Sequence, residues 1–219
     1  MNKFLSFLAF VILFSLFSSD ISAQFGEGWE YKKETEGVKV WIRTPKNSSF
    51  KEVLVKTSYN ASMSTLVAVG MDISSYNKWV YASKEAKLLE KISEQEVIYY
   101  SESEVPWPFE NRDIILRSTV KQDPDTKIVN IYSDRVTDYM PKKDGIVRVP
   151  DFVAQWVLTP QEDGSIEATY YIKTDPGGVV PAWLMNVFVD KGPVESFGGL
   201  RKLSKQEPYK SLNLDYIID

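Results

Sequence analysis

Between residues 86 and 175, strand-like runs rich in β-branched and aromatic residues follow one another without a helical segment between them. Turn chemistry separates several of these runs, as in Asp123-Pro124-Asp125 and Glu162-Asp163-Gly164. Successive strands joined by short turns pair antiparallel, because a parallel pair needs a long crossover connection. Two further β-rich runs, 37–43 and 50–59, precede them. This succession predicts one large antiparallel sheet.

Two segments have helical rather than alternating periodicity. Residues 62–81 repeat apolar side chains at helical spacing, and Ser62 or Ser64 is a suitable N-cap, which predicts one or two short helices. Residues 181–205 carry a longer apolar stripe and predict one long amphipathic helix near the C-terminus. Pro193 lies inside this segment and predicts a bend, because proline removes one helical hydrogen bond.

The long helix can bury its apolar stripe only against the concave face of the sheet. The predicted fold class is therefore α+β, with a curved antiparallel sheet wrapped around a long C-terminal helix. Residues 24–219 contain no internal repeat or low-complexity linker and are expected to form one domain. An internal hydrophobic cavity is expected if side chains do not fill the space between sheet and helix. A filled interior would instead indicate a structural or protein-interaction module.

Side chains alternate between the two faces of a strand, so every second residue of three runs is expected to face the helix. In 152–158 and 168–172 the even-numbered positions are apolar or aromatic, whereas in 112–119 the odd-numbered positions include two charges and are expected to face outward. Ordinary core packing is the simplest interpretation, but inward Tyr and Trp residues also suit a ligand pocket. The pair Gly198-Gly199 is unfavourable inside a helix and is expected where a ligand or another backbone comes close. The residues predicted to line the pocket are Arg112, Ile114, Leu116, Phe152, Ala154, Trp156, Tyr170, Ile172, Leu184 and Phe188.

The chain of 219 residues contains no Cys and no His. The lack of Cys excludes disulfides, thiol catalysis and cysteine-based metal sites, and the lack of His removes the commonest general base and metal ligand. No metal site and no cofactor are expected, because only scattered Asp and Glu residues remain as ligands. The net charge of −4 and the short basic cluster Lys142-Lys143 argue against a nucleic-acid partner.

Two functions are open for a chain with such a pocket. The first is a non-enzymatic carrier that binds a lipid, sterol or fatty acid, and no catalytic residue is assigned under it. The alternative is an enzyme of the same fold, such as a cyclase, dehydratase or hydrolase, that acts on an apolar substrate. Its best candidates are Glu102 and Glu104, which share a strand face and suit an acid–base pair. A solvated strand face is the simpler interpretation of these two carboxylates.

Residues 1–23 have the pattern of a secretory signal peptide. A basic residue near the start is followed by an apolar stretch from Phe4 to Phe17, and cleavage is expected after Ala23. The apolar stretch is shorter than the roughly 20 residues that span a bilayer, and an uncleaved membrane anchor is the alternative. The mature protein, residues 24–219, is then expected to be secreted across the inner membrane, and the lack of Cys favours the bacterial periplasm.

Two motifs follow each other along the chain. The run "PWPFENRD" spans Pro106 to Asp113, and Asp-Pro-Gly-Gly at 175–178 precedes the long helical segment. Together they resemble the START family, the steroidogenic-acute-regulatory-protein-related lipid-transfer domains, whose members have a Pro-aromatic-Pro corner before Asn-Arg-Asp and the same turn before the last helix. The resemblance extends over about residues 27–205. It includes further matches at Asp72, Trp79, residues 145–150, Val180-Pro181, Trp183-Leu184 and Asn186.

The resemblance implies the helix-grip fold, in which a curved antiparallel sheet holds the C-terminal helix over a hydrophobic tunnel for one lipid. It implies a lipid or other hydrophobic small molecule as partner and a transient contact with a membrane, and it leaves the oligomeric state open. Arg112 is then expected to meet either a polar group of the ligand or, in a structural role, a carboxylate or a backbone carbonyl. The loop Gln122–Thr126 and the C-terminal helix are the candidate lids.

One departure from the family concerns the headgroup of the ligand. Family members selective for phosphatidylcholine cage the choline group with aromatic side chains through cation–π contact. A rough alignment places Ser101 where one such aromatic falls, and Phe152 keeps an aromatic ring at another pocket position without a hydroxyl. The resemblance therefore does not support a choline cage in this chain.

Overall fold

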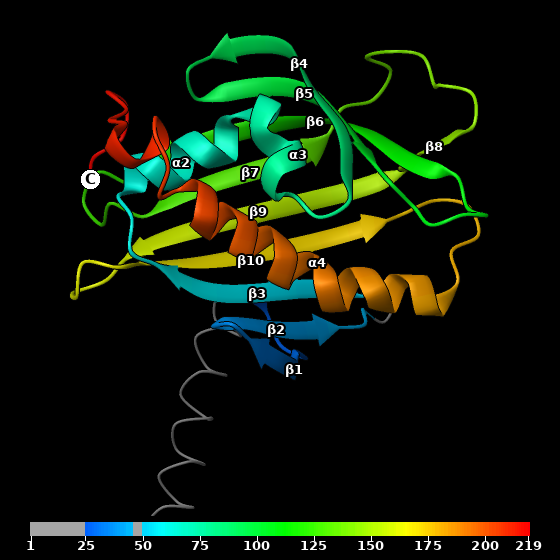
Figure 1. Cartoon of the computed structure of the whole chain (residues 1–219), viewed down its shortest axis with the longest axis horizontal. Coiled ribbons are helices and arrows are strands. Elements are labelled where there is room, and N and C mark those ends of the chain that lie inside the picture. The colour runs from blue at the N-terminus through cyan, green and yellow to red at the C-terminus, as the bar shows by residue number, and fades with distance from the viewer. Residues whose placement is uncertain (1–24, 46–49) are drawn as a thin grey trace, which may run out of the picture.

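The computed structural model describes residues 25–45 and 50–219 (Figure 1). Ten strands in these residues form one sheet in the order β1-β2-β3-β10-β9-β7-β6-β5-β4, with β8 beside β6. Neighbouring strands pair antiparallel, except β6 and β8, which are parallel. The strands are β1 (Glu30–Thr35), β2 (Val38–Arg43), β3 (Glu52–Tyr59), β4 (Ser83–Ser93), β5 (Glu96–Ser103), β6 (Asn111–Gln122), β7 (Val129–Arg135), β8 (Ile146–Arg148), β9 (Asp151–Pro160) and β10 (Ile166–Asp175).

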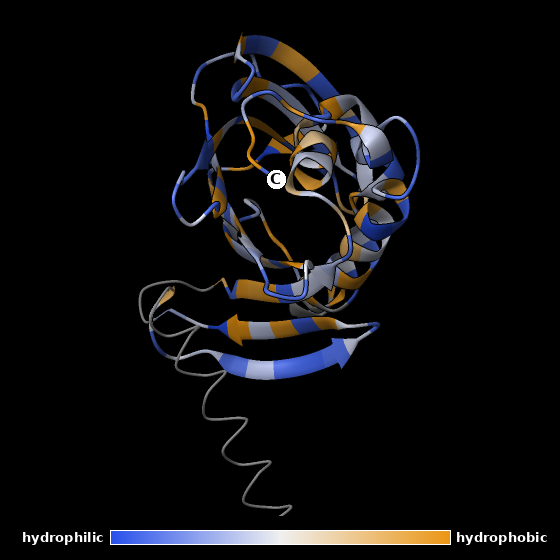
Figure 2. Ribbon diagram, turned by 90° about the vertical axis from the view of Figure 1, so that its left-hand side faces the viewer, coloured by the Kyte–Doolittle hydropathy of each residue, from blue (hydrophilic) through white to orange (hydrophobic). Residues whose placement is uncertain are grey.

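The sheet is curved, and its strands curl around one interior (Figure 2). β3 and β10 are far apart in sequence but pair antiparallel, with Tyr59 opposite Ile166 and Val53 opposite Ile172. The helix α4 (Ala182–Leu203) runs across the concave side and contacts β2, β3 and the short helix α3 (Tyr76–Trp79). The predicted fold class, α+β with a curved antiparallel sheet and a long C-terminal helix, is confirmed.

The segment between β3 and β4 is helical, as its periodicity predicts. It forms α2 (Met63–Met71), a 3₁₀ turn η1 (Ile73–Ser75) and α3 (Tyr76–Trp79), and a second 3₁₀ turn, η2 (Tyr209–Ser211), follows α4. Ser62 rather than Ser64 is the N-cap of α2, because its hydroxyl accepts a hydrogen bond from the backbone N–H of Thr65 at 3.1 Å. The hydroxyl of Thr65 in turn donates to the carbonyl of Tyr209 at 2.8 Å, which attaches η2 to α2.

α4 is one continuous helix with Pro193 in its interior, and it changes direction near its middle (Figure 1). That change agrees with the predicted bend, since proline removes one hydrogen bond of the helix. A Cβ atom at Gly199 would lie 2.9 Å from the Cα of Trp79, so glycine allows α4 to approach α3 closely. Gly198, by contrast, has nothing within 4 Å of its Cβ position. The predicted close approach of another backbone is therefore confirmed for Gly199.

Two strands are absent from the sequence-based prediction. β1 is polar and mostly exposed, so it lacks the apolar alternation that identifies a strand. Glu36 and Gly37 both have positive φ and join β1 to β2 in a tight hairpin turn, where Thr35 pairs with Val38. β8 has three residues and is defined by its pairing with β6.

The odd-numbered residues of β6 face away from α4, as predicted, but this face is not exposed along its whole length. Asp113 and Ile115 are buried, whereas Arg117 is exposed. The chain between β7 and β9 crosses this face of the sheet, and Val136 and Met140 pack against the cluster that contains Ile115. A covering segment that arrives from elsewhere in the chain leaves no mark on the local sequence pattern.

The predicted signal peptide, residues 1–23, lies outside the described residues. Among the helices of the described part of the chain, none is both long enough and apolar enough to cross a membrane. Secretion across the inner membrane therefore stays a prediction from the sequence.

Candidate ligand-binding cavity

A cavity of about 370 Å³ lies between the concave face of the sheet and α4. Its volume falls within the range of roughly 300–1,000 Å³ that is typical of small-molecule pockets. Most of its wall consists of apolar and aromatic side chains from α2, α3, α4 and the strands β3, β5, β6, β7, β9 and β10. The protein's own side chains do not fill an interior of this size, which argues against the filled structural module.

The structure brings all ten residues predicted to line the pocket to this one cavity. The even-numbered positions of β6, β9 and β10 face it, because each strand turns one face towards α4. Two of the ten lie on α4 and border the cavity from the other side. The ten are Arg112, Ile114, Leu116, Phe152, Ala154, Trp156, Tyr170, Ile172, Leu184 and Phe188. Contact of these side chains with a ligand stays a prediction.

Other parts of the wall do not follow from the strand pattern. They come from α2 and α3 and include Leu66, Tyr76 and Trp79. Their place depends on the packing of the short helices against α4 and the sheet, which local periodicity does not predict. The sequence does hold one signal, the closely spaced aromatic residues of α3, whose rings meet edge to face at 5.3 Å between centroids.

Three aromatic rings from different elements form one side of the cavity. Trp156 of β9 stacks on Phe197 of α4 with 4.8 Å between the ring centroids, and it lies 4.7 Å from the ring of Tyr170 on β10. Pairs of this kind contribute about 0.5–1.5 kcal/mol beyond the burial of their area. This cluster holds α4 against β9 and β10 at the edge of an otherwise open interior.

Hydroxyl groups gather at one place on the mainly apolar wall. The Oγ atoms of Ser118 on β6 and Ser133 on β7 are 2.6 Å apart, and the hydroxyl of Tyr99 interacts with both serines. Tyr76 donates its hydroxyl hydrogen to the carbonyl of Gly70 at 2.7 Å. Burial raises the pKa of Tyr76 and of Tyr99 above the usual value of a phenol, so both are neutral at pH 7. These hydroxyl groups therefore use one another and the backbone as partners.

Arg112 is the second residue of β6, at one end of the cavity, and is only 8% exposed. Its guanidinium donates to the backbone carbonyls of Glu110 at 2.5 Å, Gly177 at 3.3 Å and Pro176 at 3.5 Å. Burial lowers the pKa of Arg112 and the neighbouring Glu110 raises it, and a guanidinium remains protonated at pH 7. The structure therefore confirms one of the two roles expected for Arg112, namely hydrogen bonding to backbone carbonyls.

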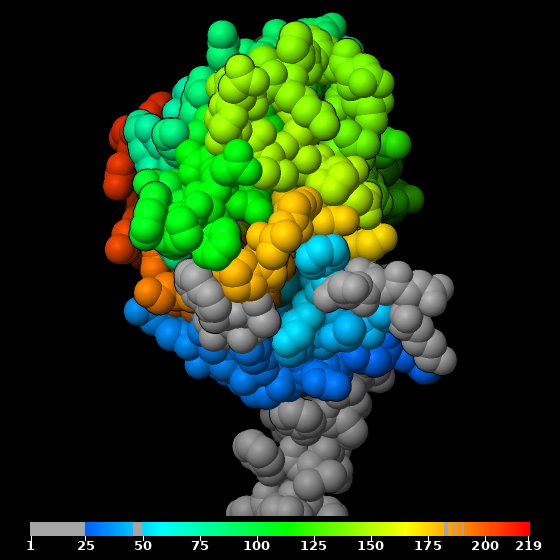
Figure 3. Space-filling view, turned by 90° about the vertical axis from the view of Figure 1, so that its right-hand side faces the viewer, coloured from blue at the N-terminus to red at the C-terminus, as the bar shows by residue number. Residues whose placement is uncertain are grey.

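Two loops lie side by side at the Arg112 end of the cavity (Figure 3). Residues 104–110 join β5 to β6, and residues 176–181 join β10 to α4. Both loops supply a carbonyl to Arg112, and each presents an exposed apolar side chain to solvent. Trp107 is 91% exposed and Val179 is 85% exposed. From the two loops, Val105, Pro176 and Val180 border the cavity beside Arg112.

The loop Gln122–Thr126 is not a lid of this cavity, and that prediction is wrong. None of its residues borders the cavity. The side chain of Gln122 instead donates to the carbonyl of Ile218 at 2.8 Å and accepts from the N–H of Ile218 at 2.7 Å. This loop therefore binds the C-terminal residues at the end of β6 that is farthest from Arg112. α4 borders the cavity, and its role as a lid stays a prediction.

Glu102 and Glu104 do not form an acid–base pair beside the cavity, and that candidate is wrong. Glu104 is exposed, whereas Glu102 is buried and does not border the cavity. Glu102 accepts hydrogen bonds from Lys84 Nζ at 2.9 Å, Asn111 Nδ2 at 2.7 Å and the Tyr100 hydroxyl at 3.1 Å. Burial alone would raise the pKa of Glu102, but these hydrogen bonds lower it below the usual value.

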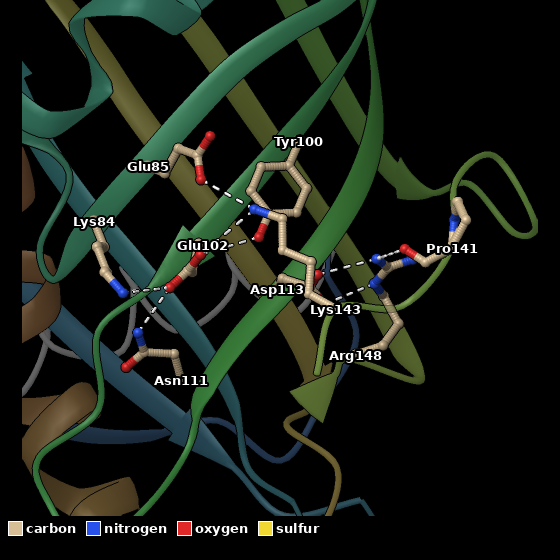
Figure 4. Close-up of polar contacts among 9 residues, drawn as sticks. All are labelled: Lys84, Glu85, Tyr100, Glu102, Asn111, Asp113, Pro141, Lys143 and Arg148. Atoms are coloured by element: carbon tan, nitrogen blue, oxygen red, sulfur yellow. Dashed lines mark hydrogen bonds and ion pairs between the residues drawn. The ribbon is translucent and has the colours of Figure 1, made fainter. Parts of the chain in front are cut away.

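A second ion pair continues this polar cluster on the outer side of the sheet (Figure 4). Arg148 donates to both carboxylate oxygens of Asp113, from Nε at 2.6 Å and from Nη2 at 3.0 Å. Lys143 Nζ lies 3.1 Å from Glu85 and 3.8 Å from Glu102. These contacts hold the chain between β7 and β9 against the sheet. Within residues 25–45 and 50–219, no three acidic side chains are grouped so that they could hold a metal ion.

Comparison with known proteins identifies the family. The START domain model matches residues 21–208, most of the chain. The chain belongs to the START domain family. The two motifs of this START domain, 106–113 and 175–178, are widely separated in sequence but meet in space, because Arg112 of the first binds carbonyls of the second.

Relatives of this START domain include proteins of similar length. An uncharacterized protein of Pseudomonas aeruginosa is 33% identical over 180 residues, which cover 82% of this chain and 88% of that protein. The phosphatidylcholine transfer protein of Rattus norvegicus is 26% identical over 177 residues, which cover 78% of this chain and 81% of that protein. Among solved structures, the STAR-related lipid transfer protein of Xanthomonas axonopodis is 29% identical, with a TM-score of 0.75, and the match covers 82% of this chain and 100% of that one.

Proposed function

We propose that this START domain binds one lipid in the cavity between the sheet and α4 and carries it between membranes. The observation that carries the proposal is the cavity itself, which is enclosed by mainly apolar and aromatic side chains. Burying an acyl chain in such a space gains about 0.8 kcal/mol for each CH₂ group, enough to offset extraction from a bilayer. The relatives named as lipid transfer proteins support the same function.

We propose no chemical step on the bound lipid. The chain has neither His nor Cys. Asp113 is an acidic residue at the cavity wall, but its carboxylate lies on the outer side of the sheet, where both oxygens accept hydrogen bonds from Arg148. An enzyme of this fold would need a general acid and a general base within reach of its substrate. The described residues of the wall offer no such pair, so the carrier is the better supported of the two functions.

The proposed membrane contact is made by the two loops at the Arg112 end of the cavity. Their exposed apolar side chains, Trp107 and Val179, point to solvent rather than into the interior. Tryptophan is favourable at a membrane–water interface, because its ring is apolar and its N–H is polar. The loops that would touch the membrane are thus the loops that border the cavity. A lipid would therefore have a short path from the membrane into the cavity.

Secretion across the inner membrane, with a final location in the periplasm, is a further part of the proposal. The signal-peptide pattern of residues 1–23 supports it. The intact mass of the protein exported by a bacterial host is the measurement that checks it. Cleavage after Ala23 would leave a chain that begins at Gln24, and an unprocessed chain would contradict this part of the proposal.

Mass spectrometry of organic extracts tests lipid binding directly. The protein is purified from its bacterial host without detergent, and the extract is searched for a lipid in a fixed ratio to the protein. A stoichiometric lipid is the expected result and would identify the ligand class. A protein that is empty, and that also takes up no phospholipid, sterol or fatty acid from vesicles, would contradict the proposal.

A pair of variants on β9 locates the lipid in the cavity. Ala154→Trp adds bulk on the face that borders the cavity, so we expect the lipid per protein to fall at least about tenfold, which corresponds to roughly 1.4 kcal/mol of affinity. Val153→Trp places the same side chain on the opposite, 42% exposed face and should leave the lipid content unchanged. Equal lipid contents in the two variants would place the ligand elsewhere.

A further inference from the structure

The Arg112 end of the cavity is rich in hydrogen-bond donors. Ser103 of β5 pairs directly with Arg112 of β6, and Ser101 lies two residues away on the same face. Both serines border the cavity. Within the described residues, no side chain or backbone group forms a hydrogen bond with either hydroxyl. Their hydroxyl groups are therefore available to a ligand, unlike those of Ser118 and Ser133, which bind each other.

Arg112 also has N–H groups that the described residues do not use as hydrogen-bond donors. Three of the five N–H groups of a guanidinium are used for the carbonyls of Glu110, Pro176 and Gly177, which leaves one on each Nη atom. In the part of the chain that the structure describes, Arg112 forms no ion pair with a carboxylate. A buried charge that has no carboxylate in direct contact is unfavourable, so an anion that enters the cavity would stabilise this side chain.

The charges around this end favour an anion over a cation. Lys51 borders the cavity as a second positive charge. Asp113 borders it too, but both of its carboxylate oxygens bind Arg148. The carboxylate of Glu110 interacts with Arg112 from the solvent-exposed loop. Ser101, which stands where an aromatic residue of a choline cage falls, borders the cavity, and so does Phe152, which keeps an aromatic ring without a hydroxyl.

Away from Arg112, the cavity suits a hydrophobic tail. Along β9 its wall runs from Phe152, opposite Thr174, to Leu158, opposite Ala168. The six steps along the strand from Phe152 to Leu158 span about 20 Å, so an extended chain of roughly that length fits along the wall. The wall around Leu158 is apolar and includes Leu66 and Leu200. The cavity therefore has a polar end and an apolar end, like an amphiphile.

We propose that the ligand is a lipid with an anionic headgroup, a phosphate or a carboxylate, bound by the Arg112 guanidinium together with the hydroxyls of Ser101 and Ser103. The planar fork of arginine matches two oxygens of either group, and a charge-assisted hydrogen bond is stronger than a neutral one. This inference rests on the proposed lipid-binding function and names the ligand class of the same cavity.

Matched pairs of lipids test the inference. Vesicles of one fixed phosphatidylcholine composition carry a trace of labelled phosphatidic acid or of diacylglycerol with the same acyl chains, and a second pair contains oleate or oleyl alcohol. We expect the protein to take up the anionic member of at least one pair about tenfold better, the effect of a single charged contact. Equal uptake within both pairs would overturn the anionic headgroup but keep the lipid carrier, whereas no uptake of any lipid would overturn both.

Variants assign that preference to the proposed residues. Arg112→Gln should reduce the preference to nearly equal uptake, and Arg117→Gln on the exposed face of the same strand should leave it intact. Arg112 also holds two loops, so the double variant Ser101→Ala/Ser103→Ala tests the site without removing those contacts. We expect the double variant to lower the preference about threefold, because two hydrogen bonds to the anion are lost. An unchanged preference in both the Arg112 and the double variant would refute the site.

Inorganic phosphate distinguishes a lipid headgroup from a soluble anion. Since most of the binding free energy of a lipid comes from its tail, phosphate alone should neither displace bound phosphatidic acid nor raise the thermal midpoint of the protein. A phosphate concentration that stabilises the protein as much as phosphatidic acid does would show that the site serves a soluble anion. That result would overturn the inference.

Discussion

Glu102 is a charged side chain buried on the outer side of the sheet, and its partners determine its ionisation. Lys84, Asn111 and Tyr100 all donate hydrogen bonds to its carboxylate. They lower its pKa from the usual value of 4.5, against the effect of burial. Because the pKa is lower in the folded chain, the carboxylate contributes stability above pH 4.5. That contribution is lost as the pH falls through the folded value.

Replacing Glu102 by glutamine should therefore lower the free energy of unfolding by about 2 kcal/mol at pH 7, since buried donors lose a charged acceptor. The difference from the wild type should begin to shrink below pH 4.5, where the carboxylate of the unfolded chain takes up a proton, and should be lost as the pH falls through the lower pKa of the folded chain. Urea unfolding at several pH values measures both effects. Glu104→Gln is the control, because Glu104 is an exposed residue two positions further along the chain. It should change the free energy of unfolding by less than about 0.5 kcal/mol. A pH-independent effect of Glu102→Gln would contradict the assigned pKa direction.

Two adjacent glycines of α4 differ in their surroundings, since Gly199 lies against α3 and Gly198 has open space. This difference makes the packing of α4 against α3 testable. Gly199→Ala would place a Cβ atom 2.9 Å from the backbone of Trp79, so α4 and α3 would have to separate. We expect a loss of about 1–3 kcal/mol from such overpacking. Gly198→Ala meets no atom within 4 Å and should stabilise the protein by about 1 kcal/mol through helix propensity. Thermal unfolding of the two variants checks the difference, and equal shifts would show that the α3–α4 contact is not tight.

The sequence predicts some strands and misses others, and the difference lies in how each strand is buried. β9 and β10 follow from period two, because one face of each borders the cavity and residues such as Ala154 and Ile172 alternate regularly. β1 does not follow, because its exposed side chains need no apolar alternation. The acid–base candidate at Glu102 fails for another reason. Its partners Lys84 and Lys143 lie on different segments, and only tertiary packing brings them to one carboxylate.

The cavity arises from contacts between segments that are far apart in the sequence. The sheet curls because β3 pairs with β10, and α4 is held across it by the rings of Trp156, Tyr170 and Phe197. The wall residues on the strands are predictable from sequence, whereas the contribution of α2 and α3 to the wall depends on how those helices pack. Arg112 then joins the loop before β6 to the loop before α4, so one end of the cavity is built by both family motifs.

The loops at the Arg112 end of the cavity make the proposed membrane contact testable through Trp107. Trp107→Ala should weaken binding to vesicles about tenfold, because withdrawing one indole ring from the interface loses roughly 1–2 kcal/mol. Flotation of the protein with vesicles measures the effect. Lipid already bound should be retained, since Trp107 is 91% exposed and does not border the cavity.

Tyr132→Ala is the matched control for that experiment. Tyr132 is a 42% exposed aromatic residue on β7, and its variant should bind vesicles like the wild type. If both variants lose vesicle binding equally, the membrane contact is spread over the surface rather than placed at the loops. If Trp107→Ala binds vesicles normally but releases its lipid, the loop acts on the cavity and not on the membrane. We expect Trp107→Ala to bind vesicles more weakly and to retain its lipid fully. This result would show that Trp107 contacts the membrane and that the lipid binds at a separate site.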